Sequence, residues 1–278
     1  MHLNKERNPY FILVGTIVIG MGISMLQLET PAASSAQKEE LRFTFLEGDS
    51  ERERLEVENL RQQRLSQNQE QHPEVTGHFY EAIQTITNPD DLLVFVNKNY
   101  RLSPTYQPTD LTRPEVRTAS GQTNQDLYLR EEVSHQLERM FQAALSEGVH
   151  LIAKSGYRSY ETQAALYQRY VQLNGVEYAN RISAKPGHSE HQTGLAIDLA
   201  SMENHQQLNQ SFAQTTEGKW LAQHAHEYGF ILRYPTGRES DTGYTYEPWH
   251  FRYVGEEVAS LLNAQNWILE DYVLIYQR

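Results

Sequence analysis

The chain has 278 residues, of which 39% are hydrophobic and 22% are charged, and its formal net charge is −12. This length suits one domain with extensions or two small domains. The negative charge argues against nucleic acid as a partner, because clustered Lys and Arg are needed to neutralise phosphates. The chain has no cysteine, so disulfides, a thiol nucleophile and Cys-based zinc sites are excluded. Any metal must be held by His, Asp or Glu.

An apolar stretch, FILVGTIVIGMGISMLQL, covers residues 11–28 near the start of the chain. As a helix it would span about 27 Å, close to the thickness of the apolar core of a membrane. Basic residues precede it and Glu29 follows it, which predicts an N-terminus inside the cell. The small residues of PAASSA at 31–36 could also form a signal-peptidase site. We therefore expect residues 1–36 to be a membrane anchor, which the length of the stretch favours, or a cleaved signal. Either alternative places the rest of the chain outside the cytoplasm, anchored to the membrane in the first case and secreted in the second.

Residues 37–75 differ in composition from the rest, being rich in Glu, Arg and Gln. Leu55, Leu60 and Leu65 are five residues apart, a spacing that gives no continuous apolar helix face. We expect a charged linker or stalk with little fold of its own, and the alternative is a solvated helix of the main domain. The main domain is predicted to cover residues 76–278.

Apolar periodicity and turn residues predict alternating helices and strands over residues 76–278. The predicted helices are a short one near residue 78 and longer ones at 130–148, 159–175, 218–229 and 255–267. The predicted strands are at 92–97, 149–156, 194–200, 230–235 and 250–255. Ser159 is expected to cap the helix that follows it. This mixture predicts an α+β fold with a central, mostly antiparallel sheet flanked by helices.

The stretch SEHQTGLAID places His191 before a predicted strand and Asp198 within it. An imidazole and a carboxylate suit Zn²⁺, but a catalytic zinc site needs a third protein ligand and an open position for water. The stretch YEPWHF supplies His250 as that ligand, with Glu247 three residues earlier. Pro248 cannot donate to a sheet ladder, so the chain must turn there, which lets Glu247 and His250 reach one pocket. We expect one zinc ion at the sheet on His191, Asp198 and His250. Glu247 would stay off the metal and accept a proton from water.

Arg158 lies in SGYRSY, between a predicted strand and a predicted helix. Its guanidinium could stabilise the oxyanion that forms when water attacks an amide carbonyl, or hold a substrate carboxylate. Taken alone, an arginine in such a place is more often part of a surface ion pair. The chain has no G-x-S-x-G and no S-x-x-K near a K-T-G, so a serine penicillin-binding mechanism lacks its parts.

Three separated stretches resemble the VanY-type D-alanyl-D-alanine carboxypeptidases, which are zinc metallopeptidases that trim peptidoglycan stem peptides. They are SGYRSYETQ, KPGHSEHQTGLAIDL and GKWLAQHAHEYGFILRYPTGRESDTGYTYEPWHFRYVG. The resemblance covers residues 92–272 and is strongest over residues 155–255. The related L,D-carboxypeptidases, which remove the terminal D-Ala of tetrapeptides, share the motifs around the metal.

The resemblance also implies roles for individual residues. It implies zinc on the ligand set inferred above, Glu247 as general base and Arg158 polarising the scissile carbonyl. It implies that Ser189 and Gln163 contact the substrate peptide and that Trp249 lines the same pocket. Read alone, Ser189 could instead cap a turn, and Trp249 could be a core aromatic residue.

The function that the resemblance implies is zinc-dependent hydrolysis of the terminal D-Ala from peptidoglycan stem peptides. L,D-carboxypeptidase activity on tetrapeptide stems is one alternative, and an inactive cell-wall binding module of the same fold is another. The complete ligand set and general base weigh against the inactive module. A purely structural zinc site is disfavoured because such sites usually have four protein ligands. We expect stem peptides as the partner, no nucleic acid, and a monomer that meets the membrane only through its N-terminal segment.

Overall fold

The computed structural model of the chain describes residue 59 and residues 79–80, 82–119 and 127–276. The predicted anchor or signal at 1–36 lies outside the described residues, as does the predicted linker at 37–75 apart from residue 59. Within the described part of the chain, no helix is long and apolar enough to cross a membrane.

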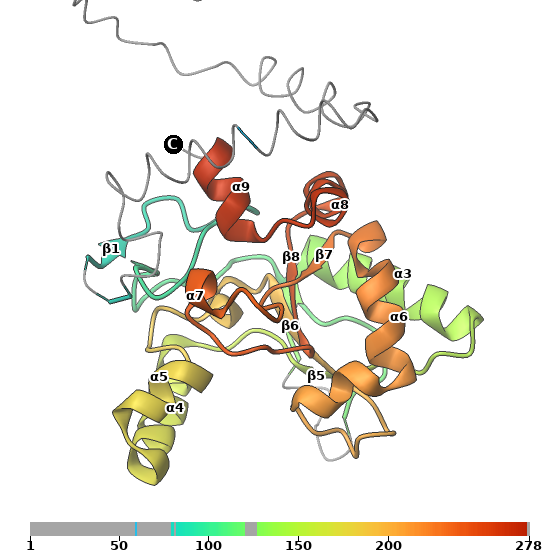
Figure 1. The fold of residues 1–278 in the computed structure, drawn as a ribbon, viewed down its shortest axis with the longest axis horizontal. Coiled ribbons are helices and arrows are strands. Elements are labelled where there is room, and N and C mark those ends of the chain that lie inside the picture. Colours follow the sequence, from blue (N-terminus) through green and yellow to red (C-terminus); the bar gives the residue numbers. More distant parts are fainter. Residues whose placement is uncertain (1–58, 60–78, 81, 120–126, 277–278) are drawn as a thin grey trace, which may run out of the picture. The chain divides into compact units, whose positions relative to one another are not determined.

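A four-stranded antiparallel sheet forms the centre of the fold, in the order β5-β6-β8-β7 (Figure 1). Its strands are β5 (Ile152–Ser155), β6 (Ala196–Ala200), β7 (Phe230–Leu232) and β8 (His250–Tyr253). Each lies within a strand predicted from the sequence. The expected α+β class with a central antiparallel sheet is therefore confirmed.

The longer helices also follow the predictions. They are α3 (Glu131–Ser146), α4 (Tyr160–Asn174) and α8 (Glu256–Gln265). Ser159 caps α4 as expected, because its hydroxyl accepts a hydrogen bond from the backbone N–H of Thr162. The helix predicted at 218–229 is divided into α6 (Thr216–His224) and a 3₁₀ helix, η5 (Ala225–Tyr228).

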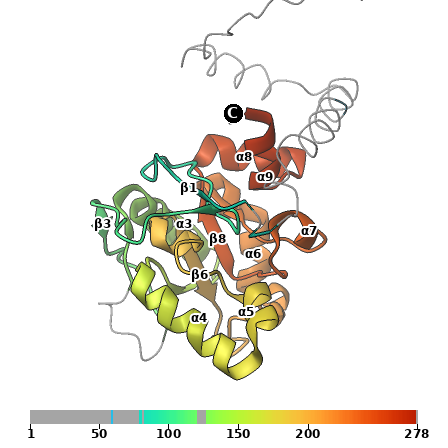
Figure 2. The same ribbon diagram turned by 90° about the vertical axis from the view of Figure 1, so that its left-hand side faces the viewer.

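The other helices of the described residues are short and were not predicted. They are α5 (Val176–Ile182), α7 (Glu239–Thr242), α9 (Leu269–Tyr276), η3 (Glu190–Thr193) and η4 (Gln210–Gln214). Figures 1 and 2 both place α4 and α5 beside each other at one end of the sheet and α8 and α9 at the opposite end. The sheet between these two helix pairs is where the functional residues gather.

The segment at 79–119 differs from the prediction. No helix forms near residue 78 in the part that is described, and residues 92–97 form no strand. The backbone carbonyls of Leu92 and Val94 instead accept hydrogen bonds from the buried guanidinium of Arg252. Two-residue strands occur on either side of this stretch and in the next part of the chain. They are β1 (Gln84–Thr85) with its parallel partner β2 (Tyr100–Arg101), and β3 (Leu111–Thr112) with its antiparallel partner β4 (Leu129–Arg130).

Strand β6 packs one face into the main apolar cluster and carries Asp198 between two alanines on the other. Ile197 and Leu199 are fully buried in the main apolar cluster, together with Leu137 and Met140 of α3. Asp198 lies between the two β6 residues and points to the opposite face, because successive side chains alternate across a strand. The packing of Ile197 and Leu199 therefore holds the Asp198 carboxylate in a fixed place.

Candidate active site

Three sequence-predicted residues meet at the end of the sheet. His191 lies on η3, Asp198 on β6 and His250 at the first position of β8. Asp198 and His250 are direct cross-strand partners, and Gly194, with a φ of 68°, ends η3 and lets the chain enter β6. The Asp198 carboxylate lies 2.9 Å from Nδ1 of His250 and 3.3 Å from Nε2 of His191. One ligand atom from each residue lies within 4.8 Å of the others.

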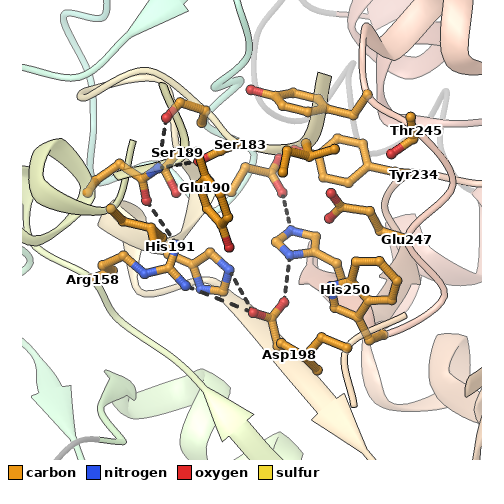
Figure 3. Close-up of a pocket in the computed structure, with 18 of the residues that line it drawn as sticks. Arg158, Ser183, Ser189, Glu190, His191, Asp198, Tyr234, Thr245, Glu247 and His250 are labelled. Atoms are coloured by element: carbon orange, nitrogen blue, oxygen red, sulfur yellow. Dashed lines mark hydrogen bonds and ion pairs between the residues drawn. The ribbon is translucent and has the colours of Figure 1, made fainter. Parts of the chain in front are cut away.

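The turn expected at Pro248 is present. The backbone N–H of His250 donates to the carbonyl of Glu247 at 3.1 Å, which closes a tight turn through Pro248 and Trp249. Figure 3 shows the Glu247 carboxylate beside the His250 ring, facing the same pocket as Asp198. Glu247 is therefore near the candidate metal site and offers a carboxylate that the three ligands leave free to act as a base.

The three candidate ligands open into a cavity of about 330 Å³. All the residues that the sequence suggested for the site line this cavity: Arg158, Gln163, Ser189, His191, Asp198, Glu247, Trp249 and His250. Tyr170, Tyr178, Ile182 and Leu208 add an apolar part to its wall. A mixed wall with a few convergent polar groups is typical of a small-molecule or peptide site.

Arg158 belongs to this cavity rather than to a surface ion pair. Its guanidinium donates to the side chains of Gln163 and Ser155, both at 2.9 Å, and lies 4.0 Å from the Asp198 carboxylate. The amide nitrogen of Gln163 in turn donates to Ser183 and to the carbonyl of Ala184. The hydrogen bonds of Gln163 thus hold Arg158 in place.

Ser189 and Trp249 also have environments that bear on their roles. Ser189 stands at the N-cap position of η3, but its side chain makes no capping hydrogen bond, which weakens the interpretation as a turn cap. It lines the cavity and is buried. Trp249 is only partly buried and packs against the main apolar cluster while it also lines the cavity.

The pKa values of two carboxylates in the site, Asp198 and Glu247, are shifted in opposite directions. Burial alone would raise the pKa of Asp198, but His191 and His250 hold it well below its usual range. Burial raises the pKa of Glu247 to about 7, although the nearby His250 opposes the shift. Burial lowers the pKa of His191, so its ring favours the neutral form that can bind a metal. One carboxylate is thus kept ionised, while the other can exchange a proton near neutral pH.

The donor set fits a zinc ion. Two imidazoles and one carboxylate are a ligand set of catalytic zinc, and all three residues are buried and converge on one point. The second ring nitrogen of His191, Nδ1, lies 2.7 Å from the carbonyl oxygen of Gly156, which can only accept a hydrogen bond. His191 therefore carries its proton on Nδ1 and directs the lone pair of Nε2 toward the site.

Some residues of the site carried no signal in the sequence. Glu190 is buried behind His250, where it contacts Arg233 and Arg252. Tyr234 stacks on the His250 ring, with centroids 5.0 Å apart and planes 25° from parallel. Glutamates are mostly exposed to solvent, so the sequence gives no sign that Glu190 is buried. Its burial becomes evident only from the arginines that pair with it in the folded structure.

Comparison with known proteins shows the family of the chain. Residues 126–256 match the sequence model of the VanY family, described as D-alanyl-D-alanine carboxypeptidase. The chain is 44% identical over 192 residues to YodJ of Bacillus subtilis, which covers 69% of this chain and 70% of YodJ.

Two solved structures of carboxypeptidases are also similar. The LD-carboxypeptidase LdcB is 45% identical with a TM-score of 0.66, and the match covers 68% of this chain and 89% of LdcB. The vancomycin resistance D,D-pentapeptidase VanY of the VanB-type cassette, solved with Zn(II), is 30% identical with a TM-score of 0.52. That match covers 65% of this chain and 98% of VanY. The chain therefore belongs to the VanY D-alanyl-D-alanine carboxypeptidase family and is a zinc metallo-carboxypeptidase.

Proposed function

We propose that this protein hydrolyses the bond before the terminal D-alanine of peptidoglycan stem peptides. The observation that carries the proposal is the buried cluster of His191, Asp198 and His250, which shares one cavity with Glu247 and Arg158. The family supplies the substrate class, and the cavity supplies the parts that amide hydrolysis requires. An inactive binding module would not need a base and an oxyanion partner beside a complete ligand set.

In the proposed mechanism His191, Asp198 and His250 hold one zinc ion. Zinc supplies a Lewis acid and lowers the pKa of water to about 7. Glu247 accepts the proton of the attacking water, whose oxygen adds to the scissile carbonyl carbon. Glu247 then gives this proton to the amide nitrogen as the carbon–nitrogen bond breaks and D-alanine leaves as an amine. A pKa of about 7 suits a group that both accepts and donates.

The remaining residues are proposed to position the substrate. Arg158 directs its fork into the cavity and donates to the carbonyl oxygen where negative charge develops. Gln163 acts through Arg158, because its oxygen already accepts from that guanidinium. Ser189 and Trp249 are proposed to contact the peptide directly, one through its hydroxyl and the other through its ring.

A second candidate is L,D-carboxypeptidase activity on tetrapeptide stems. The likeness to LdcB supports it, because both the identity of 45% and the TM-score of 0.66 exceed those for the D,D-pentapeptidase VanY. Both activities release D-alanine through the same chemistry, so they differ in the residue that precedes the scissile bond. The chemistry at the scissile bond is the same for both, so the two substrates must be compared directly.

The test uses purified protein with a pentapeptide ending in D-Ala-D-Ala and a tetrapeptide ending in one D-Ala. We expect release of D-alanine from at least one peptide, loss of release with a chelator, and recovery on adding zinc. Glu247→Gln should bind zinc as well as the wild type and lose about 10²- to 10⁴-fold in rate. Release of D-alanine at the wild-type rate by zinc-loaded Glu247→Gln would contradict the assigned base. Release from neither peptide would contradict the proposed function.

The location of the protein is also a proposal. We propose that the catalytic domain, residues 76–278, acts outside the cytoplasm as a monomer, where its stem-peptide substrates are found. The apolar stretch at 11–28 supports this, as anchor or as signal, and the charged residues 37–75 would separate the domain from the membrane.

A further inference from the structure

The His250 ring is hydrogen-bonded or ion-paired on both of its nitrogens. Nδ1 lies 2.9 Å from Oδ1 of Asp198, on the side of the candidate metal site. Nε2 lies 3.3 Å from Oε2 of Glu190, on the opposite side, and Figure 3 shows the ring between the two carboxylates. The Asp198 side of the ring therefore faces the metal, and the Glu190 side faces the protein interior.

Glu190 is held in this position by two arginines. Its Oε1 accepts from Nε of Arg233 at 2.7 Å and from Nη1 of Arg252 at 2.9 Å. Arg233 also donates two hydrogen bonds to Glu270, at 2.7 and 2.8 Å. Each of these four side chains is at most 2% exposed. Two carboxylates and two guanidiniums balance in charge, which burial at this depth requires.

Arg233 and Arg252 determine which carboxylate oxygen of Glu190 faces His250. Because both of them bind Oε1, only Oε2 is directed at the imidazole, and an ionised carboxylate oxygen can only accept a hydrogen bond. Tyr234 stacks on the ring and keeps its plane in line with this oxygen. Without a metal, the Asp198 carboxylate can likewise accept a hydrogen bond from Nδ1. When a metal takes Nδ1, the proton that remains on the ring lies on Nε2, where Oε2 of Glu190 accepts it.

We propose that Glu190 is a positioning residue that selects Nδ1 of His250 as the metal-binding nitrogen. The inference rests on the proposed zinc site. His191 has the complementary arrangement, in which the Gly156 carbonyl holds a proton on Nδ1 and leaves Nε2 for the metal. The two histidines would thus bind one ion through different nitrogens, and each is fixed by an acceptor on its far side.

Glu190→Gln tests the proposal with almost no change in shape. Arg233 and Arg252 need an oxygen, so the amide oxygen should take the place of Oε1, and the amide nitrogen should then face Nε2 of His250. That nitrogen donates, so the proton of the imidazole would move to Nδ1 and block the metal. We expect zinc affinity, measured by competition with a chromogenic chelator, to fall about 10- to 100-fold.

Glu270→Gln is the matched control. It removes a carboxylate from the same buried group, on the same arginine, but Glu270 has no hydrogen bond to His250. We expect Glu270→Gln to keep wild-type zinc affinity, although it too removes a charge from the buried group. Equal losses of affinity in the two variants, or none in Glu190→Gln, would overturn the proposal. Wild-type protein that binds no zinc would instead refute the proposed function.

A measurement on the unaltered protein keeps the proposal testable if the variants do not fold. Protein with ¹⁵N-labelled histidine and bound zinc should show Nε2 of His250 protonated and Nδ1 bound to metal. His191 should show the reverse pattern. The His250 signals can be assigned by their loss in His250→Gln. Metal bound at Nε2 of His250 would overturn the proposal, whatever the activity.

Discussion

The raised pKa of Glu247 suits its proposed role as a base but makes its ionised form unfavourable in the folded protein. Its pKa in the folded, metal-free protein is about 7, against 4.5 for the ordinary side chain, and burial is the main cause. A raised carboxyl pKa means that folding favours the protonated form. The contribution of Glu247 to the stability of the folded protein is therefore fully present below pH 4.5, and it is lost as the pH rises through 7. A pKa shift of this size corresponds to a loss of roughly 3 kcal/mol in the free energy of unfolding at pH 8. Residual solvent contact of the carboxylate reduces the expected loss to about 2 kcal/mol.

Glu247→Gln should therefore stabilise the metal-free protein at pH 8 and have little effect at pH 4.5. The amide has nearly the same shape and cannot ionise, so it avoids the cost of a buried charge. Urea unfolding of both proteins at the two pH values measures the difference, which we expect to reach about 2 kcal/mol at pH 8. Titrating groups that do not interact with Glu247 contribute equally to both proteins and cancel. The same difference at both pH values would show that the pKa of Glu247 is not raised.

At the scale of single residues, the sequence predicted the candidate metal ligands but not the residues that hold those ligands in place. His191, Asp198, His250 and Glu247 could be predicted because zinc hydrolysis restricts the residue types, and Pro248 required the turn that brings two of them together. Glu190 could not, because its partners lie 43 and 62 residues further along the chain. Only the folded sheet brings these charges together.

Among the elements, the turn from η3 into β6 sets the spacing of two ligands. Gly194 makes this turn at a φ of 68°, and its carbonyl accepts a hydrogen bond from the N–H of Arg130 at 3.0 Å. A Cβ at this position would lie 3.0 Å from Leu111 and 3.1 Å from Arg130. A side chain here would be strained in its backbone and crowded by its neighbours, so the path from His191 to Asp198 would have to shift.

Gly194→Ala should lower the free energy of unfolding by about 2 to 3 kcal/mol and weaken zinc binding. Gly148→Ala is the control, because Gly148 has a similar φ of 78° and no atom within 4 Å of an added Cβ. It should lose about 1 kcal/mol and keep its zinc affinity. Urea unfolding and chelator competition measure the two effects. Equal losses of stability with unchanged zinc affinity in both variants would refute the role given to Gly194.

The predicted elements succeeded where a long periodic pattern or a cap was present and failed where long-range contacts decide. Helix α3 has an apolar face over its whole length, and Ser159 marks the start of α4. Residues 92–97 have the composition of a strand, but a guanidinium from β8 binds two of their carbonyls. Helices α5, α7 and α9 are at most eight residues long, too short for a clear period.

The whole catalytic unit extends beyond the residues that match the family model. The match begins at residue 126, yet residues 79–119 supply buried parts of the core, among them Val94, Val96 and Leu102. The same segment satisfies buried polar groups of the site region. The N–H of Leu102 donates to the carbonyl of Gly187, and the side chain of Gln192 donates to the carbonyls of Ser103 and Tyr106. These contacts make the segment part of the domain.

A chain that begins at residue 127 should therefore fail to fold, whereas one that begins at residue 76 should keep the stability and zinc affinity of the full protein. Burial of Val94, Val96 and Leu102 contributes roughly 5 to 9 kcal/mol at about 1.5 to 3 kcal/mol each, which is comparable to the whole stability of a domain. The shorter chain would also leave the guanidinium of Arg252 without the carbonyls of Leu92 and Val94. Near-ultraviolet circular dichroism and urea unfolding of both chains measure the difference. Cooperative unfolding of residues 127–278 at the same urea midpoint as residues 76–278 would show that the segment is dispensable. A lower midpoint for residues 76–278 than for the full protein would move the domain boundary upstream.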